Sequence, residues 1–462
     1  MTVFVVIVAV LAVLALLGLV HRWLWVRLVR DTTRPGGPAR RAGTVLAFAL
    51  PLLSVAALLA GRAGAPFWLQ RVVAWPGFLW LAVLLYLTLA MLVAEPLRRL
   101  WLRRLTRDTA ARPGAEPGDA DVAPAPRVPA GSEAVPAPAA GPALCGDSGG
   151  EPGAPAGRSG RPPETVPGSG AGPGGRAPDP APAAPVGGVS RRVFVARTLG
   201  GAAVAAAGLT VGNGAYGVLR GPRVKRVRVP LARLPRAAHG FRIAVVSDVH
   251  LGPILGRAHT QRIVDTVNRT QPDLIAVVGD LVDGNVHDLG PAAEPLRLLR
   301  SRHGSFFVTG NHEYFSGAQQ WVDHVRELGL TPLENARREL PHFDLAGVND
   351  VQGEKEGKGP DFQAALGDRD RSRASVLLAH QPVVIDEAVR HGVDLQLSGH
   401  THGGQLWPGN YLAELANPTV AGLERYGDTQ LYVSRGAGAW GPPVRVGAPS
   451  DITVVELASY HT

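Results

Sequence analysis

Apolar runs divide this chain into two kinds of segment. Three long runs near the N-terminus, Val3–Val20, Gly43–Ala60 and Val72–Ala94, have no polar face. Each is about as long as the roughly 20 apolar residues that a bilayer requires, so they predict membrane-spanning helices. From about residue 221 onward, apolar runs of about five to seven residues alternate with helical patterns. This second pattern is typical of an α/β domain.

The later part of this α/β region is richer in strands. The apolar runs that predict them are Phe343–Val348, Val376–Ala379, Leu395–Leu397, Leu431–Ser434 and Ile452–Leu457. Trp321, Val325 and Leu328 recur at helical spacing between the earlier runs. A layered sandwich of two sheets flanked by helices therefore fits better than one doubly wound sheet, with residues 221–462 as a single domain.

Two further segments separate the membrane region, residues 1–107, from that domain. Residues 108–189 are rich in Pro, Gly and Ala, which predicts a disordered linker because few of these side chains can form a core. Residues 190–220 begin with Ser190-Arg191-Arg192 and continue as an Ala/Gly-rich apolar stretch. The paired arginines resemble a twin-arginine-like signal that stays uncleaved as an anchor, and a fourth transmembrane helix is the alternative.

The arginines of the short loops predict the orientation of the membrane region. Those after the first predicted helix are Arg22, Arg27, Arg30, Arg34, Arg40 and Arg41, and those after the third are Arg98, Arg99, Arg103, Arg104 and Arg107. Only Arg62 and Arg71 lie between the second and third helices. Because arginine-rich loops stay in the cytoplasm, the N-terminus is expected outside. Either interpretation of residues 190–220 then predicts a multi-pass protein of the cell membrane with an extracytoplasmic domain.

Composition narrows the classes of partner. The formal net charge is +9, and nearly all of the basic excess is arginine beside hydrophobic segments. Arginines in this position are typical of the flanks of membrane-spanning segments, so no nucleic-acid partner is predicted. Cys145 is the only cysteine, which excludes a disulfide within the chain and a thiolate metal site. No sequence feature defines the oligomeric state.

Five apolar runs each end on side chains that can bind a metal ion. FRIAVVSDVH ends on Asp248 and His250, DLIAVVGD on Asp280, GSFFVTGNH on Asn311 and His312, SVLLAH on His380, and DLQLSGHTHGG on His400 and His402. Strands that deliver such residues to the following loops build sites at one edge of a sheet. These ligands are too many for one ion and suit two. Two ions in turn indicate hydrolysis of a phosphate ester.

The residue types suggest a role for each ligand. A ligand shared by two ions needs two oxygens, which favours the carboxylate of Asp280. Asp248, His250 and His402 suit one ion, and Asn311, His380 and His400 suit the other. His312 follows Asn311 directly and points elsewhere, so it is expected to protonate the leaving oxygen or hold a phosphate oxygen. Asp283 orients His312 or another imidazole, or caps a helix.

These blocks resemble the calcineurin-like metallophosphoesterase family. In chain order they are Asp248-Val-His250, Gly279-Asp280-Leu-Val-Asp283-Gly284, Gly310-Asn311-His312-Glu313, His380 and Gly399-His400-Thr-His402-Gly403-Gly404. The resemblance implies a four-layer α/β/β/α sandwich, preceded here by transmembrane helices. It also implies two divalent ions (Mn, Fe, Zn or Mg), with Asp248, His250, Asp280 and His402 on one and Asp280, Asn311, His380 and His400 on the other. His312 would assist catalysis. The GHTHGGQ form is similar to a membrane-bound bacterial branch described as phosphodiesterases or as similar to lipid-linked pyrophosphate hydrolases.

Three functional hypotheses follow. The first is a membrane-anchored phosphoesterase that uses metal-activated water on a phosphodiester or phosphomonoester, with a lipid or envelope phosphate among the candidate substrates. The second is a catalytically silent metal-binding sensor, which would be expected to lack Asp280, Asn311 or His312; all three are present. The third is a cytoplasmic-facing phosphatase of nucleotides or phosphoproteins with the same site. A transporter is disfavoured because the predicted spans contain no ionisable residue.

Overall fold

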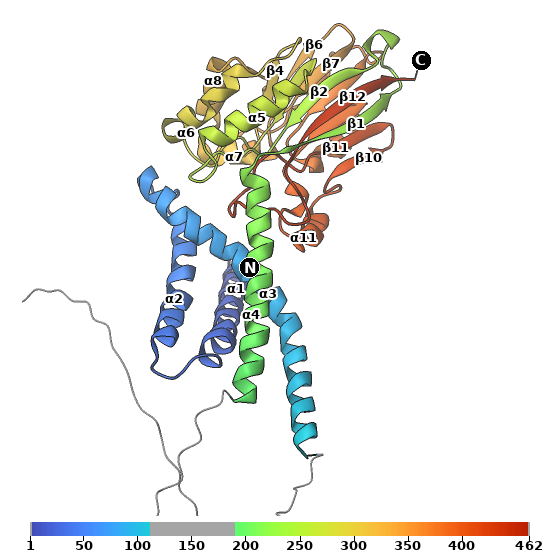
Figure 1. Cartoon of the computed structure of the whole chain (residues 1–462). Coiled ribbons are helices and arrows are strands. Elements are labelled where there is room, and N and C mark those ends of the chain that lie inside the picture. The colour runs from blue at the N-terminus through green and yellow to red at the C-terminus, as the bar shows by residue number, and fades with distance from the viewer. Residues whose placement is uncertain (1, 111–189, 461–462) are drawn as a thin grey trace, which may run out of the picture. The chain divides into compact units, whose positions relative to one another are not determined.

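A computed structural model of the chain describes residues 2–110 and 190–460. The predicted linker therefore lies outside the described residues from position 111 onward. Met1–Thr106 and Val189–Thr462 belong to one compact unit. Within this unit, long N-terminal helices precede a sandwich of two β-sheets (Figure 1).

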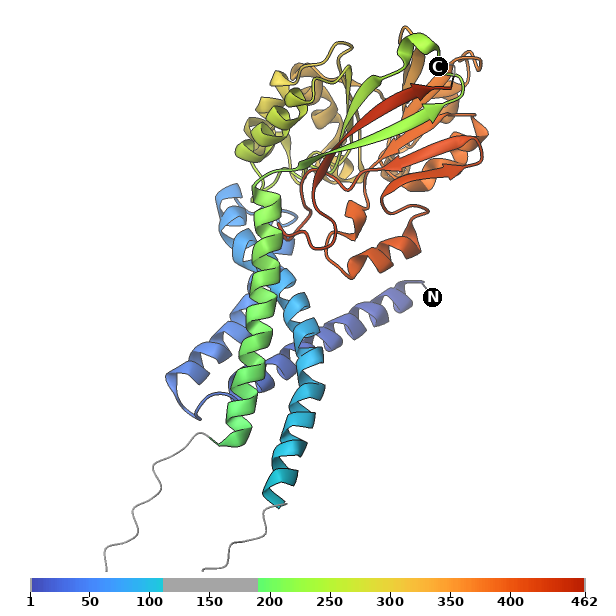
Figure 2. The ribbon, with the colours of Figure 1, turned by 45° about the vertical axis from the view of Figure 1, so that its right-hand side comes forward.

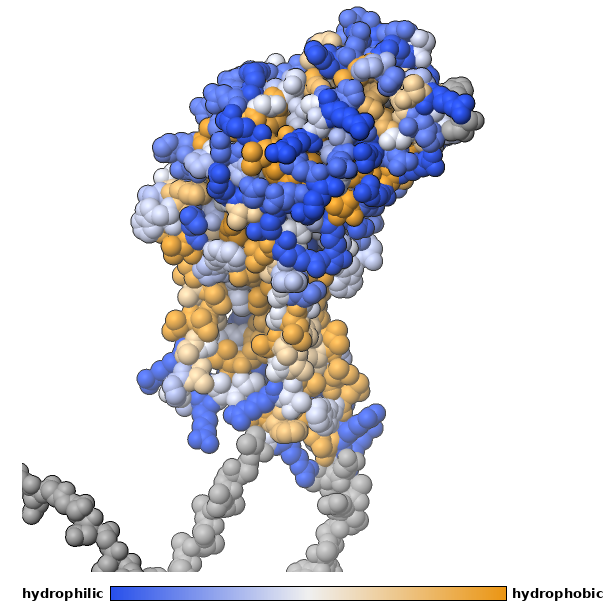
Figure 3. Space-filling view, turned by 45° about the horizontal axis from the view of Figure 1, so that its top comes forward, coloured by the Kyte–Doolittle hydropathy of each residue, from blue (hydrophilic) through white to orange (hydrophobic). Residues whose placement is uncertain are grey.

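Among the described residues, four helices are long and apolar enough to cross a membrane. They are α1 (Thr2–Trp25), which continues as the π-helix η1 (Val26–Arg30), α2 (Pro38–Leu59), α3 (Phe67–Ala110) and α4 (Arg191–Leu219). The three runs predicted as spans lie within α1, α2 and α3, and residues 190–220 contain the fourth helix. The helices expose many large apolar side chains, and their surface is mostly hydrophobic, whereas that of the sandwich is mostly hydrophilic (Figure 3).

Close backbone approach holds α2 against α3. The hydroxyl of Ser54 on α2 donates to the carbonyl oxygen of Gly77 on α3 at 2.8 Å. A Cβ atom on Gly77 would lie 2.8 Å from the Ala57 side chain, which is too close for any residue but glycine. Small residues at such crossings let helices pack tightly where the surrounding lipid gives no hydrophobic driving force.

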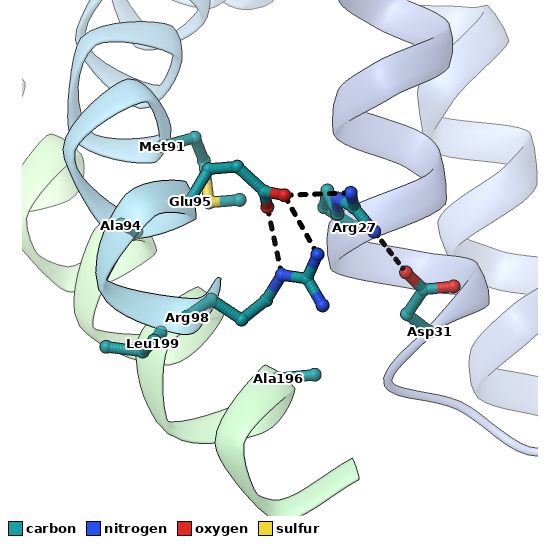
Figure 4. Close-up of a pocket in the computed structure, with 9 residues that line it drawn as sticks. Arg27, Asp31, Met91, Ala94, Glu95, Arg98, Ala196 and Leu199 are labelled. Carbon is teal, nitrogen blue, oxygen red and sulfur yellow. Dashed lines mark hydrogen bonds and ion pairs between the residues drawn. The ribbon is translucent and has the colours of Figure 1, made fainter. Parts of the chain in front are cut away.

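A charged cluster joins α1 to α3 at the arginine-rich end of the helices. The buried carboxylate of Glu95 accepts hydrogen bonds from Arg27 at 3.0 Å, Arg98 at 2.8 and 2.9 Å, and Arg99 at 3.1 Å. Figure 4 shows Arg27 and Arg98 converging on Glu95. The cavity beside them has a volume of about 10 Å³, room for one water at most. The cluster therefore connects helices and offers no ligand site.

Two six-stranded sheets form the sandwich (Figure 1, Figure 2). The first runs in the order β1 (Arg223–Leu231), β12 (Asp451–Ser459), β2 (Phe241–Val246), β3 (Leu274–Val278), β4 (Ser305–Val308) and β5 (Thr331–Pro332). The second runs in the order β10 (Gly422–Tyr426), β11 (Thr429–Val433), β9 (Leu395–Ser398), β8 (Ala374–Leu378), β7 (Phe343–Gly347) and β6 (Ala336–Glu339). Strands β2 to β5 are mutually parallel, as are β7, β8, β9 and β11.

Helices cover both outer faces of the sandwich. The first sheet carries α5 (Arg257–Arg269), α6 (Val286–Ala293) and α8 (Ala318–Glu327), and the second carries α9 (Phe362–Leu366) and α10 (Ile385–Arg390). A separate core that includes Ile243, Phe343 and Tyr432 fills the space between the sheets. Shorter elements are α7 (Asn311–Ser316), α11 (Gly409–Ala416), and the 3-10 turns Arg236–Ala238, Glu294–Leu298, Val351–Glu356, Pro382–Val384 and His402–Gly404. The expected four-layer α/β/β/α class is confirmed.

Strand β1 and helix α11 are among the elements of the sandwich that had no counterpart in the sequence prediction. Strand β1 alternates basic and apolar residues, so it lacks the continuous apolar run that marked the predicted strands. It pairs along its whole length with β12 at the other end of the chain, a contact that no local pattern reveals. Helix α11 follows the last metal-binding motif and has no buried residue, so the periodicity of a buried face is missing.

Replacement of Trp321 tests the packing between α8 and the loop after β3. The ring is fully buried, and its Nε1 donates to the carbonyl oxygen of Gly284 at 2.8 Å. Trp321→Phe removes the donor, and it is expected to lower the free energy of unfolding by about 1–3 kcal/mol. Trp321→Ala also leaves a cavity, so about 3–5 kcal/mol is expected. Thermal unfolding of the detergent-solubilised chain measures both, with the exposed Trp68→Phe as control. Equal shifts at Trp68 and Trp321 would contradict the packing described.

Candidate metal centre

All of the candidate site residues follow strands that end at the same edge of the sandwich. Because β2, β3 and β4 are parallel, their carboxyl ends bring Asp248, His250, Asp280, Asn311 and His312 to one edge of the first sheet. The second sheet delivers His380 after β8 and His400 and His402 after β9. Residues up to 154 positions apart thus meet where the two sheets face each other.

Besides a group of His250, Asp280 and His312, the metal-binding atoms of the described residues form two neighbouring sets. Asp248, His250 and His402 offer atoms that all lie within 4.8 Å of one another, as do those of Asp280, His380 and His400. In the first set, Nε2 of His250 and Nε2 of His402 are 2.9 Å apart. Asn311 joins the second set, since its Oδ1 lies 3.0 Å from Nδ1 of His400. The assignment of each residue to one ion stays a prediction.

Asp280 lies between the two sets. Its Oδ2 is 3.1 Å from Nε2 of His380 and 3.8 Å from Nε2 of His250. Its other oxygen, Oδ1, accepts a hydrogen bond from the backbone N–H of His312 at 2.9 Å. A carboxylate in this position can face two cations at once, as the role of a bridging ligand requires.

Unusual backbone conformation marks most of these residues. Five of them have φ in the left-handed region: Asp248 (54°), His250 (48°), Asp280 (51°), His400 (72°) and His402 (53°). Non-glycine residues rarely adopt such angles, and they concentrate at functional sites where the surroundings hold them in place. The local backbone is therefore shaped around the side chains of this cluster.

Hydrogen bonds to the outer ring nitrogens leave the inner nitrogens free to bind a cation. Nδ1 of His380 donates to the carbonyl oxygen of Val278 at 2.9 Å, which leaves the lone pair on Nε2. Its buried Nε2 lies 3.1 Å from Oδ2 of Asp280. Nδ1 of His250 is likewise 2.9 Å from Oδ1 of Asp283. Metal-bound histidines are typically oriented in this way, so the side chains fit divalent cations.

Charge in the cluster also suits cation binding. Burial, with the positive charge of Arg445, lowers the pKa of His402 well below its usual value, and burial and His380 lower that of His400 to about 4. Both imidazoles are therefore neutral near pH 7, as metal ligands must be. Burial also disfavours a proton on His250, but the carboxylates of Asp283, Asp280 and Asp248 outweigh it and raise the pKa to about 9. The carboxylates of the site thus attract positive charge.

Asp283 connects one metal-binding histidine with His312. Its Oδ1 is 2.9 Å from Nδ1 of His250 and 2.7 Å from Nδ1 of His312. Burial opposes ionisation of Asp283, yet its contacts with His250 and His312 hold its pKa at about 2. Nδ1 of His312 is thus directed at Asp283. The His312 ring lies 5.5 Å from that of Phe315 and 5.7 Å from that of Trp440.

Glu313 holds two of the site loops together. Its buried carboxylate accepts backbone hydrogen bonds from Asp280 at 3.0 Å, Leu281 at 2.7 Å and Gly310 at 2.6 Å. Burial and the neighbouring charge of Asp280 raise the pKa of Glu313 to about 7. Its position three residues after Gly310, at the start of α7, was the available signal for a capping role.

Residues near the C-terminus support the first set of ligands. The buried guanidinium of Arg445 donates to the carbonyl oxygen of His402 at 2.8 Å and to its Nδ1 at 2.9 Å. The backbone N–H of Gly438 donates to the carbonyl oxygen of Asp248 at 2.8 Å. Gly436 has a φ of +83°, and a Cβ there would lie 2.6 Å from Cβ of Asp248. The sequence carries no local signal for the role of Arg445, because only the fold brings it to the site.

Comparisons with known proteins agree with this geometry. A family model for calcineurin-like phosphoesterases matches residues 241–404. An uncharacterized metallophosphoesterase of Aquifex aeolicus is 34% identical over 240 residues, which cover 51% of this chain and 91% of that protein. One from Bacillus subtilis is 30% identical over 288 residues, covering 59% of this chain and 98% of that protein. The chain belongs to the calcineurin-like phosphoesterase family, as its motifs indicated.

A further relative is named as a transmembrane protein. A transmembrane protein with metallophosphoesterase domain from Danio rerio is 39% identical over 250 residues. The match covers 51% of this chain and 57% of that protein's length. The family suggests a hydrolase that acts on phosphate esters and uses divalent metals, and the apolar helices here agree with membrane association.

Replacement of Glu313 tests its support of the two loops. Both carboxylate oxygens of Glu313 accept backbone hydrogen bonds. Glu313→Gln replaces one of these oxygens with an NH₂ group, so at least one buried N–H loses its acceptor. The free energy of unfolding is expected to fall by about 1–3 kcal/mol, and the purified chain is expected to retain less metal. Thermal unfolding and elemental analysis measure the two effects. The exposed Glu327→Gln is the matched control, and a Glu313 variant with unchanged metal content and stability would contradict the assignment.

Proposed function

We propose that this chain is a membrane-anchored phosphoesterase with a binuclear metal centre that hydrolyses a phosphodiester or phosphomonoester. The observation that carries the proposal is the position of Asp280 between two sets of buried ligands, 3.1 Å from His380 and 3.8 Å from His250. Asp248, His250, Asp280 and His402 would hold one cation, and Asp280, Asn311, His380 and His400 the other. When bound, two divalent cations neutralise phosphate charge and lower the pKa of the attacking water.

The protein's own groups then position and protonate the substrate. His312 stands beside the ligand sets with Nδ1 held by Asp283, so its Nε2 faces the space where a phosphate would lie. A protonated Nε2 donates a hydrogen bond to a phosphate oxygen or its proton to the leaving oxygen. Asp283 is an ionised carboxylate in contact with the ring, so it holds Nδ1 of His312 in place. His312 is therefore the proposed catalytic residue.

Hydrolysis of bis-p-nitrophenyl phosphate by the full chain with added Mn²⁺ tests the proposed activity. His400→Ala is expected to abolish most of the activity and to lower the metal content, because it removes a ligand. His312→Asn is expected to retain the metal and to lower kcat roughly 10²–10⁴-fold, the usual contribution of general acid–base catalysis.

His342→Ala is the matched histidine control for both variants. His342 directly precedes β7 and therefore lies at the opposite end of the strands from the site. Failure of the wild-type chain to hydrolyse the ester with any of Mn²⁺, Fe²⁺, Zn²⁺ or Mg²⁺, while those ions bind, would favour the metal-binding sensor.

We also propose that the sandwich lies outside the cytoplasm and that α4 remains as an uncleaved fourth span. In support, Arg197 of α4 donates to the carbonyl oxygen of Thr32, beside the cluster formed by Arg27 and Glu95. The arginine-rich ends of α1, α3 and α4 are therefore on one side, which the positive-inside rule assigns to the cytoplasm. Seven residues of α4 are buried, so the helix is packed into the molecule rather than free to be removed. The arginine pair at the start of α4 is consistent with a twin-arginine-like signal.

The single cysteine provides a test of this orientation. Cys145 lies between α3 and α4 in the sequence and is expected to react with a membrane-impermeant maleimide only after spheroplasts are permeabilised. In a Cys145→Ser background, Asp428→Cys places a thiol at a fully exposed position of the sandwich, and labelling is expected in intact spheroplasts. The reverse labelling pattern would favour a cytoplasmic-facing phosphatase of nucleotides or phosphoproteins.

A further inference from the structure

Helix α11 and the residues just before it expose large apolar side chains beside the metal site. The exposed fractions are 49% for Trp407, 59% for Tyr411, 72% for Leu412 and 85% for Leu415. These four residues are called the α11 patch below. By contrast, α8 buries Trp321, Val322 and Val325 against the first sheet. An apolar cluster of this kind on an otherwise hydrophilic sandwich indicates a surface that contacts another apolar phase.

The α11 patch is continuous with the apolar helices. The hydroxyl of Tyr86 on α3 donates to the carbonyl oxygen of Trp407 at 3.0 Å. Leu406 and Val446 pack against the buried cluster that α1, α3 and α4 share, and Val444 is a member of it. The segment that carries the patch is therefore fixed to the sides of these helices, within their apolar stretches.

The contacts with α4 set the depth of this segment. A Cβ on Gly214 would lie 2.7 Å from the side chain of Val444, so the loop packs directly on α4. Gly214 precedes Arg220, which follows the apolar part of α4, by six residues, or about 9 Å along a helix. Helices that lie in a membrane interface bury their apolar faces by about 5–10 Å. The loop beside α11 thus reaches the depth expected of an interfacial helix.

The composition of the segment fits lipid better than a protein partner. Between Gln405 and Gly422, Glu414 is the only charged residue, although the chain as a whole is rich in arginine. Trp407 and Tyr411 have the amphipathic rings that favour the boundary between headgroups and acyl chains. Leu412 and Leu415 supply further apolar side chains for contact with the acyl chains.

We propose that the α11 patch inserts into the lipid leaflet on the side of the sandwich and holds the metal site at the bilayer surface. This proposal depends on the proposed function in one respect only, because it requires that the four helices cross a bilayer. The link to the site is short, because α11 begins seven residues after His402. Gln405 also bonds both backbone groups of Trp440, donating to its carbonyl oxygen at 2.8 Å and accepting from its N–H at 3.0 Å. Trp440 in turn stands beside His312.

Fluorescence quenching by spin-labelled lipids in proteoliposomes tests the insertion. In a Cys145→Ser background, Leu415→Cys carries an environment-sensitive fluorophore, and the bilayer contains phosphatidylcholine with nitroxides on the acyl chain. The label is expected to emit at shorter wavelength and to lose most of its intensity to the lipid nitroxides. Glu339→Cys is the control, because β6 lies at the end of the sandwich away from the helices (Figure 1), and no quenching is expected there.

Three outcomes would overturn the proposal. A Leu415→Cys label with the emission of a water-exposed dye and no quenching shows that α11 stays outside the bilayer. A shifted emission without lipid quenching shows that a segment of this chain covers the patch. An emission shift that grows with the density of protein in the vesicles shows that a second copy of the chain covers the patch. Hydrolysis of bis-p-nitrophenyl phosphate in the same vesicles reports on the proposed activity separately, so a silent site and an uninserted helix are distinguished.

Discussion

Burial of several carboxylates at the edge where the two sheets meet is the constraint on which the site depends. Asp248, Asp280 and Glu313 are each almost fully buried, where a charge without partners is very costly. Backbone N–H groups satisfy Glu313, and imidazoles surround Asp280. Positive charge, on His250 or on a bound cation, compensates the remaining negative charge. The same arrangement therefore requires tightly held loops and creates affinity for cations.

The helices and the sandwich are parts of one compact unit, which changes how the membrane region is understood. The cluster around Glu95 ties α1 to α3 at one end, whereas Tyr86 and Gly214 contact the loops near the metal site further along the helices. These loops include Arg445, which also supports His402. The helices thus do more than attach a separate domain, since they pack against the segments that position ligands.

Much of the fold and of the candidate site could be predicted because its signals are local. Apolar runs that end in Asp, Asn or His mark the ends of buried strands, and the fold class they implied is confirmed. The roles of Glu313 and Arg445 were harder to predict, because buried charged residues look the same in sequence as exposed ones. Strand β1 was missed for a related reason: its pairing with β12 joins residues more than 200 positions apart.

By itself, the sequence determined which side chains could bind metal, that they follow strands, and which stretches are apolar enough to cross a membrane. Only the tertiary structure decided that the two sets of ligands adjoin, that Asp280 stands between them, and that α11 is exposed beside apolar helices. The reason is physical. Hydrophobic periodicity is encoded over a few residues, whereas the distance between two ligands depends on how whole sheets pack and on loops closed by contacts from the far end of the chain.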